Sequence, residues 1–419
     1  MNNLNTELLI PCRFDLMAKY IYIKFKENHI EIPFYKELYK AHINTFNNCW
    51  EHPGTKSGID EFFDSFNKLI DNMKKNGFNK DYPIIVGNNG VIVNGSHRLM
   101  ISFYYNIQPI FDLSYEKGNI DYHYNFFLNR DTNPQLDRFY ADYMALEYTK
   151  INPRIRSIVI YPRANIIDKN NDKFNEIINI ISSYGYVYYH KNIQLNNNGV
   201  NNLIKEMYRD EEWIGGLFPR GWSPGGKAER CDGNSYTTLI LIEMLDLNKC
   251  IELKEKCRNL YGLGKHSLHV SDEMIDTFRI AGSLLNDNSV HFLNNGTNDI
   301  SDNSKLLLNT YFNKLGENNE KFCLTSSLLL EMYGLRNAKD IDYLNRTNIN
   351  INIENIGIHD GKWFSYYSNT KDELIYNPKN YFYFNGFKFL TLENVYKMKK
   401  NRGEEKDIKD IRLIEKINI

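Results

Sequence analysis

The sequence predicts an α+β protein of three domains, which cover residues 1–150, 151–296 and 303–419. The chain has 419 residues, and at roughly 100–200 residues a domain this length suits about two to four domains. Hydrophobic residues make up 42% and charged residues 25%, which is typical of proteins whose domains each bury a core. Strand and helix patterns alternate through the middle of the chain, and the polar stretch 294–302 has the composition of a linker.

Charge and cysteine content narrow the classes of function. Lys and Arg number 51 against 52 Asp and Glu, a net charge of −1, which argues against binding nucleic acid or membranes through bulk charge. No apolar run of about 18 residues predicts a membrane span, and the N-terminus lacks the pattern of a signal peptide. The six cysteines are scattered without a CxxC pair, which predicts reduced thiols in a cytoplasmic protein.

Periodicity predicts the elements of the first segment. Apolar residues recur at helical spacing over 61–76, and Gly77 ends this helix. Two short strands, 83–86 and 91–93, flank an Asn-Asn-Gly turn. The apolar run 99–105 predicts a further helix.

A phosphate-binding turn is predicted between the second strand and this helix. Residues 94–98 are Asn-Gly-Ser-His-Arg; glycine lets a ligand approach the backbone, and N–H groups at a helix start favour phosphate. The turn resembles the ParB/sulfiredoxin-like fold, over roughly residues 60–112, where a Gly-x-His-Arg core binds nucleotide phosphates. The resemblance implies four phosphate-binding residues: Gly95, Ser96, His97 and Arg98. Sulfiredoxins carry a catalytic cysteine where Ser96 stands, so repair of sulfinic acids is disfavoured. The alternative is a purely structural turn.

A charged pair lies upstream of this turn. Asp15 and Lys19 are four residues apart, a spacing typical of a surface ion pair on a helix. Beside a phosphate site the same two charges could instead be catalytic, and the sequence leaves both interpretations open.

The middle segment is predicted to be a split βαβ sandwich. Strands at 156–161, 186–194 and 236–245 alternate with helices at 172–184 and 200–208. The loop 215–233 is rich in Gly, Pro and Arg. With its neighbours it could cover an anionic or sugar ligand or be a plain mobile loop, and its basic and aromatic residues are Trp213, Arg220, Trp222, Lys227 and Arg230.

A histidine motif carries the chemistry of this segment. Residues 268–272 are Leu-His-Val-Ser-Asp, which resembles the nucleoside-diphosphate-kinase signature, where a phosphoryl-accepting His precedes Gly-Ser-Asp. The resemblance covers most of 155–292 and implies that His269 is the catalytic phosphoryl carrier, with Tyr208 and Arg258 near the nucleotide.

Three positions depart from that family: Tyr161 replaces its Lys, His266 its Asn and Val270 its Gly. A neutral imidazole attacks phosphorus well only when its other nitrogen is held by an acceptor, and the family's acidic residue for this purpose is not at its expected place. The alternative is a structural histidine.

The third segment combines helices and strands with an acidic motif. The predicted elements are a helix at 324–333, strands at 340–344, 351–359 and 381–389, and a closing helix at 392–417. Asp340 and Asp342 alternate along a strand and therefore share a face, where two carboxylates can hold Mg²⁺ and clamp a triphosphate.

This arrangement resembles the polymerase-β nucleotidyltransferase superfamily, in which a Gly-Ser helix start precedes Asp-x-Asp. The resemblance implies catalytic and metal-binding roles for Asp340 and Asp342, phosphate binding by Ser326 and Ser327, and a third metal ligand at Asp360. It extends over 397–414, which resembles the closing helix of small members, but Ser326 replaces the family's Gly. The alternative is a degenerate domain that binds nucleotide or only a partner.

All three segments thus resemble folds that handle phosphate or nucleotide. The first interpretation is a nucleotidyl or phosphoryl transferase that uses Mg²⁺ and a nucleoside triphosphate. Its acceptor is expected to be small, such as a sugar or alditol of glycan biosynthesis, because the chain lacks a basic surface for a polymer. One alternative is a ParB-like protein that binds nucleic acid or nucleotide beside inactive companions. Another is a toxin-like nucleotidyltransferase acting on tRNA or protein.

Overall fold

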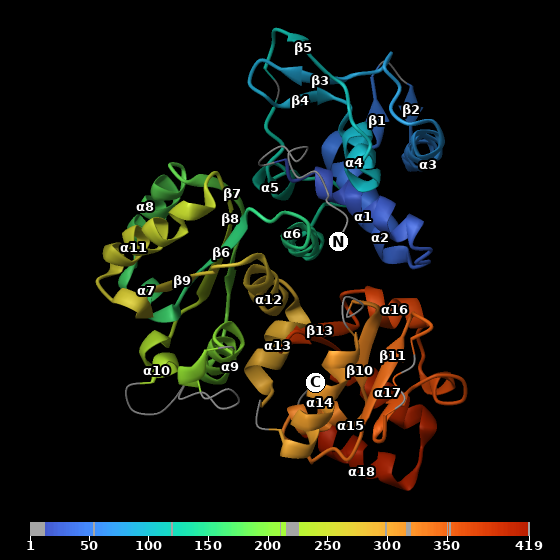
Figure 1. Cartoon of the computed structure of the whole chain (residues 1–419), viewed down its shortest axis with the longest axis vertical. Coiled ribbons are helices and arrows are strands. Elements are labelled where there is room, and N and C mark those ends of the chain that lie inside the picture. Colours follow the sequence, from blue (N-terminus) through green and yellow to red (C-terminus); the bar gives the residue numbers. More distant parts are fainter. Residues whose placement is uncertain are drawn as a thin grey trace.

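The computed structural model describes residues 13–52, 55–118, 120–209, 211–214, 226–297, 300–315, 320–349, 351 and 353–417. Helices and several small sheets alternate along the chain, which confirms the α+β class. In Figure 1 the first segment lies at the top, the middle segment at the left and the third segment at the lower right. Within the described part of the chain, no helix is long and apolar enough to cross a lipid bilayer.

The first segment combines helices with a three-stranded sheet of order β4-β3-β5, in which β3 pairs antiparallel with β4 and parallel with β5. The predicted helix over 61–76 and the two predicted strands correspond to α3, β3 and β4. The elements are α1 Leu16–Glu27, α2 Pro33–Asn47, β1 Trp50–Glu51, β2 Lys56–Ser57, α3 Ile59–Asn76, β3 Ile84–Gly87, β4 Ile92–Asn94, α4 Ser96–Tyr105, β5 Phe111–Tyr115, α5 Tyr124–Leu128 and α6 Arg138–Thr149.

The middle segment contains a four-stranded antiparallel sheet of order β7-β8-β6-β9. Strand β8 lies between β6 and β7, which is the split βαβ arrangement that the sequence predicted. The elements are β6 Ile155–Ile160, α7 Pro162–Ile167, α8 Asp172–Ile181, β7 Gly185–Ile193, α9 Asn197–Met207, α10 Lys227–Cys231, β8 Thr237–Met244, α11 Cys250–Tyr261, β9 Leu268–Val270, α12 Met274–Leu284 and α13 Asp287–Asn295.

The third segment is built on a five-stranded mixed sheet of order β12-β11-β10-β14-β13. Strand β10 pairs antiparallel with β11 and parallel with β14. The elements are α14 Asp302–Leu315, β10 Phe322–Thr325, α15 Ser327–Met332, β11 Ile341–Asn345, β12 Ile356–Ile358, α16 Lys371–Tyr376, β13 Tyr381–Phe384, β14 Phe387–Leu390, α17 Leu392–Arg402 and α18 Glu405–Ile414.

Three predictions for the third segment were wrong in detail. The helix predicted over 324–333 is strand β10 followed by the short helix α15, because β10 pairs on both sides within the sheet. The strand predicted over 381–389 is a hairpin, which turns at Asn385 and Gly386, both at positive φ. The single closing helix is two helices, because Gly403 adopts φ +67 and Glu404 then begins α18 with a capping box.

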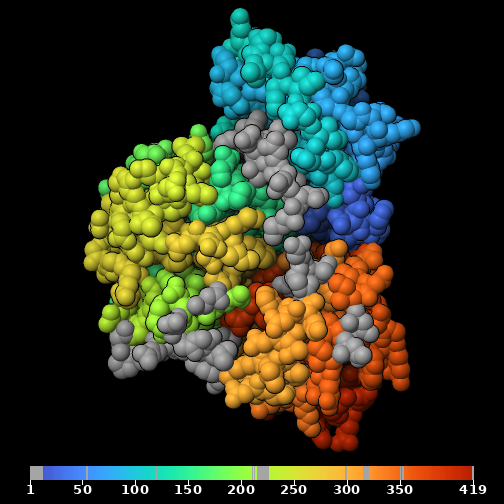
Figure 2. Space-filling model, in the orientation of Figure 1, coloured from blue at the N-terminus to red at the C-terminus, as the bar shows by residue number. Residues whose placement is uncertain are grey.

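One hydrophobic core runs through all three segments, and a second lies on the far side of the middle sheet. The first includes Phe14, Val159 and Leu324, and helices α6 and α12 pack together between the segments. The second is formed by the outer face of the middle sheet with α8 and α11. Figure 2 shows the three parts of the chain packed against one another.

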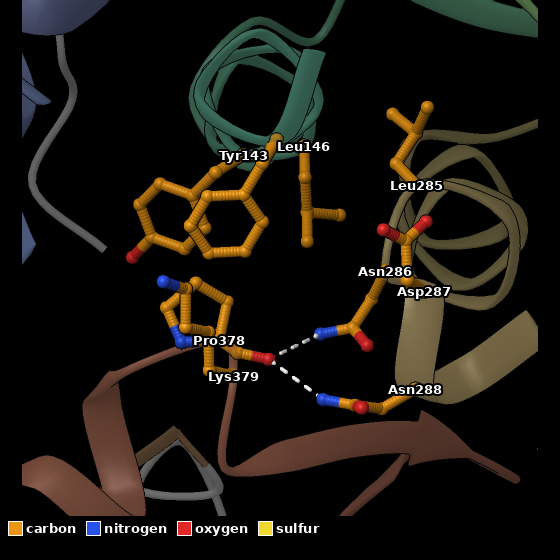
Figure 3. A pocket seen from close by; sticks show the side chains of 9 residues that line it. Tyr143, Leu146, Leu285, Asn286, Asp287, Asn288, Pro378 and Lys379 are labelled. Atoms are coloured by element: carbon orange, nitrogen blue, oxygen red, sulfur yellow. Dashed lines mark hydrogen bonds between the residues drawn. The ribbon is translucent and has the colours of Figure 1, made fainter. Parts of the chain in front are cut away.

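A cavity of about 260 Å³ lies where α6, the start of α13 and the loop before β13 meet (Figure 3). Its upper wall is Tyr143 and Leu146 of α6. The amides of Asn286 and Asn288 donate to the Pro378 carbonyl oxygen over 3.3 and 3.0 Å. These bonds tie the third segment to the middle segment.

A buried ion network joins the first segment to the third through Lys150 and Glu320, which lie 3.0 Å apart, and it makes stability depend on pH. The Glu147 carboxylate is 2.6 Å from Lys24 Nζ and 2.8 Å from Lys150 Nζ. Burial alone would raise the pKa of Glu147, but the two ammonium groups outweigh it and lower the pKa to about 2. A depressed carboxyl pKa stabilises the fold above the ordinary value of 4.5, and this contribution is lost as pH falls toward the lowered pKa.

We expect Glu147 to contribute about 3 kcal/mol at neutral pH, which disappears as pH falls from about 5 toward 2. Urea unfolding of the wild type and of Glu147→Gln at several pH values measures this. The variant should be less stable at pH 7 and should show a flatter pH dependence in the acid range. Parallel pH curves for the two proteins would contradict the assignment.

Candidate functional site

The predicted phosphate turn lies at the start of α4. Strand β4 ends at Asn94, and Gly95 reverses the chain with φ +102 before the helix begins. A Cβ at Gly95 would lie 3.0 Å from Arg98 Nη2 and 3.1 Å from Ile84 Cγ1, so only glycine fits. Because glycine also has no side chain to cap the helix, the first N–H groups of α4 remain available to a ligand.

A cavity of about 580 Å³ opens in front of this turn. Helices α1, α2 and α3 line it together with β4 and α4, so residues far apart in the sequence share one space. Its polar lining is formed by Arg13, Lys19, Tyr39, His42, Asn47, Glu51, Lys56, Ser65, Asn94, Ser96, His97 and Arg98, and its aromatic lining includes Phe46, Phe62, Phe66 and Tyr122.

Two buried cations lie at one side of the cavity, and one carboxylate holds them there. Arg13 donates to both oxygens of Asp15 over 2.6 and 2.8 Å, and Lys19 Nζ lies 2.8 Å from Oδ2. Burial alone would raise the pKa of Asp15, but these two cations keep it far below its usual range. Arg13 Nη1 also donates to the Ile92 carbonyl over 3.2 Å, which ties this cluster to β4. The pair is therefore a buried part of the cavity wall and not a surface pair.

The tautomer of His42 follows from its neighbour Lys19. Lys19 Nζ lies 3.1 Å from His42 Nε2, and an ammonium group can only donate, so Nε2 accepts and Nδ1 carries the proton. Burial and the charge of Lys19 lower the pKa of His42 well below its ordinary value, so the ring is neutral. Nδ1 is buried and has no hydrogen-bond partner among the described residues. His42 therefore presents an unsatisfied donor.

Arg98 supplies a second unsatisfied donor. Its Nη2 donates to the Pro83 carbonyl over 3.2 Å, while its Nε is buried without a partner in the described structure. Burial lowers the pKa of Arg98, and a guanidinium remains charged at neutral pH. Two unsatisfied donors, two further cations and a free helix start share one cavity, which is the chemistry of an anion site.

His97 forms part of the wall. Its Nε2 is 2.8 Å from the Tyr39 hydroxyl, and its ring meets Phe66 edge to face. Burial and the charge of Lys19 hold the pKa of His97 well below its ordinary value. One of its two nitrogens is thus engaged within the protein, and Arg98 contributes more free donor capacity than His97.

The middle segment brings His269 and Tyr208 together, as the resemblance implied. His269 lies in β9, where it pairs with Val159 of β6. Its Nδ1 is 3.0 Å from the Tyr208 hydroxyl, which lies 3.1 Å from the Tyr161 hydroxyl. Burial and the charge of Lys254 lower the pKa of His269 to about 3, so the imidazole is neutral. Tyr208 occupies the position at Nδ1 where an acidic orienting residue was expected.

Arg258 lies next to this group, and the loop that follows α9 is only partly described. Arg258 Nε donates to the Leu268 carbonyl over 3.4 Å and Nη1 to Glu255 over 2.8 Å. Lys227 Nζ lies 5.2 Å from the ring centre of Tyr161, so a cation from α10 lies beside the position where the resemblance lacks its Lys. Arg220 and Trp222 lie outside the described residues.

In the third segment Ser326 and Ser327 contact the predicted acidic pair. Ser327 Oγ donates to Asp340 Oδ1 over 2.9 Å, and the Ser326 side chain hydrogen bonds to Asp342. Ser326 adopts φ +62 and ψ −132, a conformation that costs a non-glycine residue about 1–3 kcal/mol. The turn thus has a backbone conformation that suits glycine, although a serine occupies it.

His359 is a partner of Asp342 that sequence reasoning missed. Its Nε2 donates to Asp342 Oδ2 over 3.2 Å, and its Nδ1 lies 2.8 Å from the Tyr367 hydroxyl, which lies 2.9 Å from Thr325 Oγ1. Burial alone would raise the pKa of Asp342, but the His359 contact outweighs it and lowers the pKa. The sequence signal that could have revealed this contact is a histidine directly after β12, the strand that pairs with β11.

The donors of this segment do not fit a magnesium ion. Asp360 is an exposed residue bound to Lys371 Nζ over 3.1 Å, so it does not complete an acidic triad. In the described ranges no group of three or more His, Cys, Asp or Glu side chains could hold a metal. Ser327 Oγ engages Oδ1 of Asp340, and His359 Nε2 engages Oδ2 of Asp342, whereas Mg²⁺ needs oxygen ligands that are free to coordinate it.

We therefore expect Asp340 and Asp342 to contribute little to metal binding. Mn²⁺, followed by electron paramagnetic resonance as a substitute for Mg²⁺, should bind equally to the wild type and to the Asp340→Asn/Asp342→Asn variant in the absence of nucleotide. A site that is present in the wild type and lost in the variant would restore the metal-dependent interpretation of this segment.

The closing helices α17 and α18 hold a buried ion network. Lys399 contacts Asp407 and Asp410 over 3.4 and 2.8 Å, and Arg402 donates to Asp407 over 2.6 Å. Arg336 donates to both oxygens of Asp410 over 2.6 and 2.7 Å. The charged pattern predicted over 397–414 thus joins α17 and α18 to the loop before β11.

Comparisons with protein-family models, with curated proteins and with solved structures found no match for this chain. The three resemblances therefore remain predictions.

Proposed function

We propose that this chain is a nucleotide-dependent phosphoryl or nucleotidyl transferase whose phosphorylated substrate binds in the N-terminal cavity. The observation that supports this is the donor-rich lining, in which the buried His42 Nδ1 and Arg98 Nε have no acceptor among the described residues. Buried donors without partners destabilise a protein, and phosphate oxygens beside the start of α4 would satisfy them.

The size and the aromatic lining of the cavity favour a nucleotide over inorganic phosphate. A volume of about 580 Å³ lies in the range of small-molecule sites. Phe46, Phe62 and Tyr122 on its walls offer apolar surface for a base or a sugar. The acceptor is proposed to be small, such as a sugar or alditol, and Mg²⁺ is proposed as the usual companion of a triphosphate.

Asp15 is not the group that takes a proton from an acceptor. Both of its oxygens accept bonds from Arg13, and Oδ2 also lies beside Lys19. Its role in the proposal is to hold two cations toward the substrate.

Melting curves with each nucleoside triphosphate, with and without Mg²⁺, test the proposal. One nucleotide should raise the melting temperature. At a hundredfold excess of nucleotide over its Kd, the free energy of unfolding should increase by about 2.7 kcal/mol. Turnover is then assayed with sugars and alditols as acceptors. Stabilisation by duplex DNA that fades with salt, and by no nucleotide, would favour the ParB-like alternative.

A further inference from the structure

Cationic side chains gather around His269 in the middle segment. Lys227, Arg230, Arg258 and Lys265 all lie close enough to His266 to lower its pKa, after the larger effect of burial. Lys227, Arg258 and Lys254 act in the same direction on His269. The group draws on α10, α11 and the turn before β9, so tertiary packing assembles it.

Most of these cations have partners at the surface. Lys254 Nζ pairs with Asp272 over 2.8 Å and Arg258 with Glu255 over 2.8 Å, and the two carboxylate side chains are 63% and 57% exposed. Arg230 Nη1 lies 3.4 Å from His266 Nε2. Asp272 also acts on His269, in the direction that raises its pKa, but its Oδ1 is held by Lys254.

Lys227 is the exception, because it is a buried ammonium without a carboxylate. The residue is 8% exposed. Its Nζ donates to the Lys265 carbonyl over 2.6 Å and lies 5.0 Å from the ring centre of Tyr208. No carboxylate in the described part of the chain is within ion-pair distance of Lys227. A buried charge without a counter-ion is unfavourable, and the pKa of Lys227 falls to about 8 because of burial and the repulsion of Arg258 and Lys265.

A compact anion would resolve this imbalance. Lys227 Nζ lies beside the Tyr208 ring, whose hydroxyl holds Nδ1 of the neutral His269 ring, and Arg258 Nε donates to the carbonyl of Leu268, the residue before His269. Several donors around one point suit the doubly charged oxygens of a phosphate group better than a single carboxylate. The Trp213 ring, 42% exposed and 5.0 Å from that of Tyr208, adds a surface on which a base or sugar can stack.

We infer that the middle segment holds a second anion site, in which Lys227 binds the phosphate group of a phosphorylated small molecule beside Arg258 and His269. This site is separate from the N-terminal cavity and does not depend on the function proposed for it. Lys227 is a binding residue in this assignment. The assignment does not depend on whether His269 is the phosphoryl carrier that the resemblance implies.

Calorimetric titration of the full chain with metal-free pyrophosphate tests the inference. The wild type should bind two equivalents, Lys227→Met one, Arg98→Ala one, and the double variant none. Lys249→Met is the matched control and should bind two, because Lys249 is 54% exposed and pairs with Glu252 at the surface. Lys227→Met should also melt at a higher temperature than the wild type without ligand, because it removes an uncompensated buried charge.

The outcomes separate the two sites. If Lys227→Met still binds two equivalents of pyrophosphate, the second site is overturned. It is also overturned if the wild type binds only one equivalent and Arg98→Ala binds none. A single equivalent that Lys227→Met removes and Arg98→Ala keeps would support the second site and contradict the N-terminal proposal. If Lys227→Met does not fold, Lys227→Gln replaces it, because the amide still reaches the Lys265 carbonyl without a charge and should lose the same equivalent.

Discussion

Replacing Asp15 by Asn is expected to destabilise the protein by about 3–5 kcal/mol, the range for breaking a buried ion pair. The substitution removes the negative charge that balances Arg13 and Lys19, and both cations remain buried in the cavity wall. Urea unfolding of the full chain measures the change. Phosphate or pyrophosphate should restore part of the lost stability, because an anion in the cavity would replace the missing charge.

A matched control separates this effect from the loss of any ion pair. Asp71 pairs with Lys26 over 3.1 Å, but its side chain is 69% exposed, so Asp71→Asn should cost less than about 1 kcal/mol. Equal losses for the two variants would show that Asp15 is not the buried counter-ion described above. A loss in Asp15→Asn that no anion reduces would contradict the anion site while leaving the structural role intact.

Replacing Arg98 by Ala is expected to weaken nucleotide binding in the N-terminal cavity by about 1.5–3 kcal/mol, the range for a charged hydrogen bond. Arg98 brings a charge and a free Nε–H to the start of α4. Calorimetry with the nucleotide that stabilises the wild type, in a Lys227→Met background, isolates the N-terminal cavity. Removing Arg98 should leave the melting temperature without ligand nearly unchanged, because Nη2 makes only one long bond, to Pro83.

The control for this variant is an arginine of the same segment outside the cavity. Arg138 is exposed at the start of α6 and does not line the cavity, so Arg138→Ala should bind nucleotide like the wild type. If Arg98→Ala and the wild type bind with equal affinity, residues 94–98 form only a structural turn.

Local pattern predicted short apolar runs bounded by turn residues, and helices with one apolar face. The fully buried strands β6 and β8, the strand β7 and the helices α3 and α8 fall within a few residues of their predicted bounds, since both signals are properties of the sequence itself. The α+β class followed from the same pattern. The prediction over 324–333 failed because strand β10 and helix α15 follow each other within one apolar run, where period cannot separate strand from helix. Gly403 and the Asn385-Gly386 pair were visible turn signals that the predictions did not use.

Some residues of the candidate sites could likewise be predicted from the sequence, and others could not. The sequence alone determined the glycine turn at 94–98 and the position of Asp342 on a strand, whereas the grouping of His269 with Tyr208 was expected only from the family resemblance. Only the tertiary structure placed Arg13, Lys19 and His42 in the cavity before α4, put His359 against Asp342 and brought Lys227 beside Tyr161. These contacts join separate helices and strands, and their geometry depends on how the shared core packs α1, α2 and α10 against the sheets. Period and spacing encode which face of an element is buried, but they do not encode which distant side chain that face meets.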